Sequence, residues 1–169
     1  MGTHLLNGDL YSDFFHRPEE EPTLRFIPVE PGKSVRIGNY SVMAVPVVHS
    51  VPTIGFQITS DDGKSLFYTG DTGPGLSECW EMVSPQLLII EVTASDYYQD
   101  FGGKSNHLTP GLLKEELMSF RKIRGYIPQV VTVHMSPELE VEIRDEITAV
   151  AKDLAVPITI AYENLELNL

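Results

Sequence analysis

One short segment constrains the fold of this chain more than any other. Residues Gln86–Val92, QLLIIEV, are apolar on both faces, which is typical of a strand buried between two layers. Val130–Val133 has the same character. No apolar run approaches the roughly 18 to 20 residues that a membrane-spanning helix needs. The sequence therefore predicts a globular domain whose sheet has buried central strands.

Shorter strands are expected on either side of these runs. Asp62-Gly63 predicts a hairpin turn, since both residues tolerate positive φ. Residues 1–31, which hold several prolines and the acidic run Glu19–Glu21, are expected to be an irregular lead-in with a short strand at Leu24–Ile27. The other expected strands are Val35–Ile37, Tyr40–Val48, Ile54–Thr59, Ser65–Thr69 and one or two within Ile158–Leu167.

Two helices are marked by signals at their N-termini. Thr109-Pro110 and Ser136-Pro137 each place a capping hydroxyl before a first-turn proline, and apolar residues then recur at helical spacing. A shorter helix is expected around Leu76–Val83. Strands followed by alternating strands and helices indicate the α/β class, with helices on at least one face of the sheet. The length of 169 residues suits a single domain.

The charge balance narrows the choice of partners. The chain has 24 acidic and 12 basic residues and a formal net charge of −12. This balance argues against binding to long nucleic acid, which needs a basic footprint, but it allows a small anion held by metal. The single cysteine, Cys79, cannot form an internal disulfide, and the first residues lack the pattern of a signal peptide. We therefore expect a cytoplasmic protein with no membrane partner.

Candidate metal ligands follow the predicted strands. The five histidines are too far apart for a His-x-x-x-His motif, so a metal site must be assembled from distant segments. His49, Asp71 and His134 each come just after a strand, and ligands collect at the carboxyl ends of strands in α/β sheets. Imidazole and carboxylate groups suit Zn²⁺ or Mn²⁺. The pattern therefore indicates a metal site at one edge of the sheet.

Each candidate residue also has an ordinary structural interpretation. A histidine at a strand end can simply be hydrogen-bonded, and Gly70-Asp71 can be a turn. His107 can merely precede the helix cap at Thr109, and Glu91 can pair with a buried base. Singly, none of these residues decides in favour of a metal site.

Together the residues form a pattern that is similar to a known family. Five motifs occur in one order, after a segment from Leu5 to Phe14 that also fits: Val48–Phe56, Leu66–Thr72, Leu88–Thr93, Asn106–Thr109 and Val133–Pro137. On these motifs the chain resembles the C-terminal half of the metallo-β-lactamase superfamily, in the branch of ribonuclease Z and the class II cyclic-nucleotide phosphodiesterases. The His-Leu-Thr-Pro sequence at His107 favours the cyclic-nucleotide side of that branch. The resemblance implies an αββα sandwich, of which this chain would supply one mixed sheet with helices on its outer face.

The resemblance also implies roles for single residues. His49, Asp71 and His134 would bind two divalent ions, zinc or alternatively manganese, with Asp71 bridging them. The catalytic residues would be Asp71 and His107, the latter by stabilising the transition state or protonating the leaving oxygen. Glu91 and Thr72 would orient these residues through hydrogen bonds. The superfamily's His-x-His-x-Asp-His signature, which supplies most of the metal ligands, is absent from these 169 residues, so the implied site is incomplete.

The implied function is metal-dependent hydrolysis of a small phosphodiester such as a 3′,5′-cyclic nucleotide. The alternatives are an inactive half-domain that serves as an interaction or structural module, a ribonuclease Z-like nuclease for tRNA 3′ ends, and an ordinary α/β domain. Alone, the chain is expected to bind metal weakly and to show little phosphodiesterase activity. A second copy or a complementary N-terminal half is the expected partner, because one sheet face would lack its cover. The residues of that face are Val42, Ala44, Phe56, Ile58, Leu66 and Tyr68.

Overall fold

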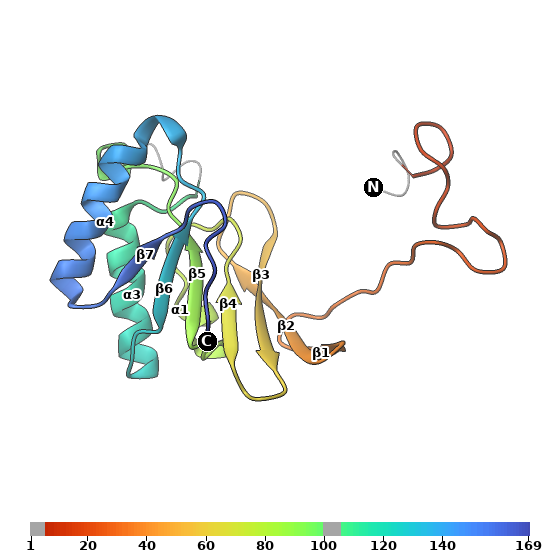
Figure 1. Ribbon diagram of the computed structural model, residues 1–169, viewed down its shortest axis with the longest axis horizontal. Coiled ribbons are helices and arrows are strands. Elements are labelled where there is room, and N and C mark those ends of the chain that lie inside the picture. The colour runs from red at the N-terminus through yellow and green to blue at the C-terminus, as the bar shows by residue number, and fades with distance from the viewer. Residues whose placement is uncertain (1–5, 100–105) are drawn as a thin grey trace.

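The fold is built on one mixed sheet of seven strands that follow one another in chain order (Figure 1). The structure is a computed structural model that describes residues 6–99 and 106–169. Strands β1 to β4 pair antiparallel, and β4 to β7 pair parallel. The bounds are β1 Ser34–Ile37, β2 Tyr40–Val47, β3 Thr53–Ser60, β4 Ser65–Tyr68, β5 Leu87–Glu91, β6 Gln129–Val133 and β7 Ile158–Ile160. The α/β class and the mixed sheet are thus confirmed.

Helices cover one face of this sheet, as Figure 1 shows. The helices are α1 Ser77–Met82, α3 Pro110–Arg124 and α4 Glu140–Leu154, with short 3₁₀ turns η1 Asp96–Tyr98 and η2 Pro137–Leu139. Between helices and sheet, the indole of Trp80 packs edge-on against both Phe67 and Phe120, at ring distances of 6.3 and 5.3 Å. All three side chains are fully buried, so this layer is the hydrophobic core.

Only one of the two predicted N-cap residues forms a capping hydrogen bond. Thr109 caps α3 as expected, because its hydroxyl accepts the N–H of Leu112 at 3.4 Å. Ser136 caps nothing: its hydroxyl donates to Glu138 instead, at 2.8 Å. The chain therefore forms the 3₁₀ turn η2 first, and the α-helix begins only at Glu140.

The lead-in contains no strand in its described part, so the strand expected at Leu24–Ile27 is wrong. The amide of Leu24 donates to the carbonyl of Phe14 within the same segment, at 2.9 Å, and the ring of Phe26 stacks on Phe15. A strand needs a neighbour to satisfy its backbone groups, and this segment extends away from the sheet (Figure 1). Leu5, the first residue of the earliest motif, lies outside the described residues.

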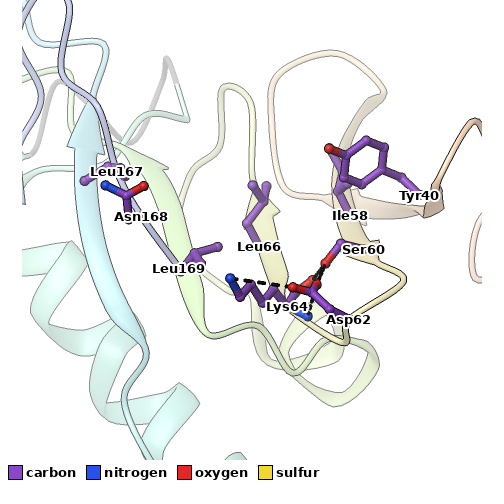
Figure 2. A pocket seen from close by; sticks show the side chains of 9 residues that line it. All are labelled: Tyr40, Ile58, Ser60, Asp62, Lys64, Leu66, Leu167, Asn168 and Leu169. Atoms are coloured by element: carbon purple, nitrogen blue, oxygen red, sulfur yellow. Dashed lines mark hydrogen bonds and ion pairs between the residues drawn. The ribbon is translucent and has the colours of Figure 1, made fainter.

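The face opposite the helices is partly covered by the chain's own C-terminus. Strand pairing puts Ile58 opposite Leu66, and both lie on the face away from the helices, because the next residue, Phe67, points into the core. After β7 the chain crosses this face towards β4 (Figure 1). There Leu167 and Leu169 line a cavity of about 360 Å³ together with Ile58 and Leu66 (Figure 2).

The face that was expected to be bare is partly buried in the structure. Val42, Phe56, Ile58 and Leu66 are half-buried and Ala44 is buried, while Tyr68 stays 44% exposed. Beyond β7 the C-terminal residues form no second strand, so only one of the one or two expected strands is present. Among the helices in the described residues, none has the length and apolarity to cross a membrane.

Candidate metal centre

The candidate residues lie at one edge of the sheet because of its topology. His49 follows β2, Asp71 follows β4, and His134 comes directly after β6, while Glu91 is the last residue of β5. Strands β4 to β6 are parallel, and β2 runs in the same direction because two antiparallel pairings separate it from β4. The carboxyl ends of these strands, and with them the polar side chains, therefore meet at the same edge.

The side chains are close enough to act together. Ligand atoms of His49, Asp71 and His107 all lie within 4.8 Å of one another. His134 joins them, because its Nε2 is 3.5 Å from Oδ1 of Asp71 and its ring centre is 5.6 Å from that of His107. The structure thus brings together His49, Asp71 and His134, as expected from the sequence, and adds His107 to the same cluster.

A buried carboxylate lies behind this cluster. Glu91 is 1% exposed, and Oε1 accepts from Nδ1 of His107 at 2.5 Å and from the amide of Thr72 at 2.9 Å. Oε2 accepts from the hydroxyl of Thr93 at 2.7 Å and from the amide of Leu108 at 3.3 Å. Because an ionised carboxylate can only accept, the Nδ1 proton of His107 is fixed, and Nε2 is the ring nitrogen left for a ligand.

His49 is oriented in the same way by a different partner. Its Nδ1 donates to the carbonyl oxygen of Asn106 at 3.0 Å, since a carbonyl can only accept. Asn106 has a φ of +52°, and His134 has a φ of +65°. Such left-handed conformations cost non-glycine residues about 1–2 kcal/mol each.

Two loops approach closely to form the site. A Cβ atom on Gly73 would lie 3.0 Å from the backbone of Asn106, so any larger residue there would push the Asp71 loop and the His107 loop apart by a few tenths of an ångström. The Asp71 loop is also hydrogen-bonded to the His49 loop, because the amide of Gly73 and the hydroxyl of Thr72 both donate to the carbonyl of Val48, at 2.5 and 3.1 Å. Thr72 thus positions the Asp71 loop through its amide and its hydroxyl.

The donor set fits a divalent metal. It offers imidazole Nε2 atoms and a carboxylate, which suit zinc and comparable ions. In proteins, a metal-binding histidine usually donates its other ring N–H to a carboxylate or a backbone carbonyl, which fixes the ring. His107 and His49 each have that arrangement, with Glu91 and with Asn106. The carbonyl of Asn106 gave no signal in the sequence, because any residue has one.

A family model described as a β-lactamase superfamily domain matches residues 6–158, which is most of the chain. The chain belongs to the metallo-β-lactamase superfamily. Divalent metals are therefore implied for this site by the superfamily as well as by its donor atoms. No curated protein sequence matches the chain.

Solved structures of the superfamily share this fold. Unliganded yeast PDE1 matches with a TM-score of 0.79 at 16% identity, over 96% of this chain and 55% of that one. YhfI from Bacillus subtilis, a metallo-β-lactamase fold protein, matches with a TM-score of 0.67 at 16% identity, over 90% of this chain and 59% of that one. The short form of human tRNase Z matches with a TM-score of 0.54 at 20% identity, over 79% of this chain and 46% of that one. The metallo-β-lactamase chain described here thus spans about half the length of these structures.

Proposed function

We propose that this chain contributes the second half of the site of a metal-dependent phosphodiester hydrolase. His49, Asp71 and His134 would hold the divalent metal, and His107 would be the catalytic histidine. The proposal is supported by one observation above all: four side chains from four distant segments lie together at one sheet edge. Two of them, His107 and His49, keep Nε2 available through bonds at Nδ1.

The residues of the chain divide the chemical work. Metal ions, when bound, would activate water and neutralise charge on the phosphate. Asp71 would supply the negative charge that offsets the charge of bound divalent cations. His107 donates a proton to the leaving oxygen through Nε2, and the buried carboxylate of Glu91 stabilises the protonated ring while that proton is held. Thr72 keeps Asp71 in place through its bonds to Glu91 and to Val48.

The proposed substrate is a small phosphodiester such as a cyclic nucleotide. The His-Leu-Thr-Pro sequence that starts at His107 and the likeness to yeast PDE1 support this choice. A likeness to a diphosphatase of the PhnP family, at a TM-score of 0.54, also favours a phosphate-containing small molecule. The likeness to human tRNase Z would favour tRNA, but the net charge of −12 opposes a long polyanion.

An inactive half-domain is the second candidate. The chain covers only 46–59% of the three structures compared above, and its 169 residues hold no His-x-His-x-Asp-His signature. In that case the chain would serve as an interaction module, with its open sheet face as the contact surface. The partner in both candidates is a complementary N-terminal half or a second copy of the chain.

Metal titration of the complete chain tests the proposal. We expect Zn²⁺ or Mn²⁺ to bind weakly in a calorimetric titration, because the ligands present leave each ion under-coordinated. Asp71→Asn should abolish this binding, since it removes the carboxylate at the centre of the cluster. Asp145→Asn, which makes the same charge change at an exposed position of α4, should leave it unchanged.

Two results would contradict parts of the proposal. Equal binding by the native chain and the Asp71→Asn variant would show that the metal lies elsewhere. Tight binding of two ions with rapid hydrolysis of a cyclic nucleotide by the chain alone would show that the site is complete without another half.

A further inference from the structure

A second buried carboxylate lies outside the candidate metal centre. Glu116 is on α3 and is 6% exposed. Its Oε1 accepts from the amide of Gly75 at 2.6 Å, and its Oε2 accepts from the indole Nε1 of Trp80 at 2.8 Å and from the amide of Leu76 at 3.3 Å. All three donors are neutral N–H groups, and two of them belong to the backbone.

Burial of a carboxylate such as that of Glu116 lowers the stability of the folded state unless its bonds stabilise the fold in return. Burying a carboxylate is unfavourable without compensating hydrogen bonds, and a helix position facing the core would ordinarily hold an apolar side chain. On the same helix, Leu113, Leu117 and Phe120 are fully buried and apolar. Glu116 differs from them in that it fixes the direction of two consecutive amides in a loop of a different element.

That loop is the one that carries Asp71. Its beginning is held by Glu91, which accepts the amide of Thr72, and its end is held by Glu116, which accepts the amides of Gly75 and Leu76. The loop thus has a buried carboxylate at each end.

The helix that carries Glu116 also determines where His107 lies. Thr109, two residues after His107, caps the N-terminus of α3, and Glu116 is about two turns further along the same helix. A rigid helix therefore connects the His107 loop to the end of the Asp71 loop. The bonds of Glu116 therefore link the end of the Asp71 loop to the helix that follows His107.

We propose that Glu116 is a positioning residue that sets the place of the Asp71 carboxylate relative to His107. The proposal rests on the proposed function in so far as Asp71 is a metal ligand. Glu116 touches neither metal nor substrate and acts through the backbone of the loop from Thr72 to Leu76.

Glu116→Gln is the direct test, with Glu115→Gln as the matched control. Glutamine keeps the size of the side chain but replaces one acceptor oxygen with an NH₂ donor, which would face N–H donors in the loop. Glu115 is the exposed neighbour on the same helix and undergoes the same chemical change. The complete chain is used throughout.

Amide hydrogen exchange measured by NMR is the first readout, because it needs no metal. In Glu116→Gln we expect exchange about 10-fold faster at Gly75 and Leu76, and also at Thr72 and Gly73, which Glu116 does not touch. Amides of β5 should keep their native rates. Acceleration confined to Gly75 and Leu76 would overturn the proposal, because it would make Glu116 only a local anchor.

Metal affinity is the second readout. Residues that orient metal ligands typically change affinity by 10- to 100-fold, so Glu116→Gln should weaken Mn²⁺ binding by about 10-fold while Glu115→Gln binds like the native chain. Unchanged Mn²⁺ affinity in Glu116→Gln would overturn the proposal.

The two readouts separate this proposal from the proposed function. If the native chain binds no Mn²⁺, the proposed function fails, and the exchange rates at Thr72 and Gly73 still decide whether Glu116 positions the loop. Should Glu116→Gln fail to fold, Glu116→Met, which fills a similar volume without a buried amide, is measured in the same way. Native exchange at Thr72 and Gly73 in a folded Glu116→Met chain would overturn the proposal.

Discussion

At the scale of single residues, burial and hydrogen bonding decide which groups can react. His107 and Asp71 face the same small volume, yet the ring of His107 is fixed by the buried Glu91, while Asp71 and His134 are about half exposed. The fixed histidine suits a proton donor that must keep one orientation.

Burial makes the thiol of Cys79 unreactive, so its reactivity tests the packing of the core. It is 4% exposed, and burial, with a contribution from Glu116, raises the pKa of its thiol to about 12. At about pH 8 the native chain should therefore react with a thiol reagent only as fast as it unfolds, since the thiolate is the reactive form. Colorimetric titration should find the thiol unreactive in buffer and fully reactive in denaturant; rapid labelling of the native chain would contradict this.

The same pKa shift has a consequence for stability. An unfolded thiol ionises near pH 8.5, whereas the folded one stays neutral until about pH 12. Between these pH values, ionisation of the thiol stabilises only the unfolded state. The free energy of unfolding should therefore fall as the pH rises from about 8.5 towards 12. Cys79→Ala, compared with the native chain, should remove this part of the pH dependence.

At the scale of elements, helix α3 has the clearest role because its N-cap, Thr109, lies two residues after His107. Its cap at Thr109 is fully buried, and its hydroxyl accepts the N–H of Leu112. Thr109→Ala should lower the free energy of unfolding by about 1 kcal/mol, because a helix N–H loses its partner. Urea denaturation measures this loss.

A second threonine provides the control for this measurement. Thr148 is exposed in the middle of α4, and its hydroxyl donates to the carbonyl of Arg144. Thr148→Ala should change the free energy of unfolding by less than about 0.5 kcal/mol, because the carbonyl keeps its helical bond and its access to water. Equal losses in the two variants would mean that the cap of α3 does not stabilise the helix.

At the scale of the whole molecule, we expect the partly covered sheet face to govern association. Leu167 and Leu169 of the C-terminal segment line a cavity together with Ile58 and Leu66, while Tyr68 remains 44% exposed (Figure 2). Because apolar patches larger than a few hundred Å² are rare on monomers, we expect light scattering at micromolar concentration to show a dimer or larger species. A compact monomer that binds no hydrophobic dye would contradict this expectation.

Removal of residues 165–169 should strengthen the association. The truncated chain loses the leucines that line the cavity over β3 and β4, so both dye binding and scattering should increase. The matched control is Glu166→Gln, which changes an exposed polar residue of the same segment and should resemble the native chain. Equal dye binding by the truncated and native chains would show that the segment does not cover the face.

The sequence by itself determined the features that depend on neighbouring residues. The apolar run at Gln86–Val92 predicted β5 at Leu87–Glu91, and Thr109-Pro110 predicted the start of α3, because strand burial and helix capping leave local patterns. The strand expected at Leu24–Ile27 failed because a strand also needs a partner, which local sequence does not specify. His49, Asp71 and His134 could be predicted because each follows a recognisable strand.

Only the tertiary structure decided how these residues are held. Glu116 bonds to Gly75 and Leu76 from 41 and 40 positions away, and His49 bonds to the carbonyl of Asn106 from 57 positions away. Backbone amides and carbonyls are the same in every residue, so no sequence pattern marks which of them a side chain will meet. That choice is made when α3 and the loops pack against the sheet, because packing brings distant backbone groups within bonding range of a buried side chain.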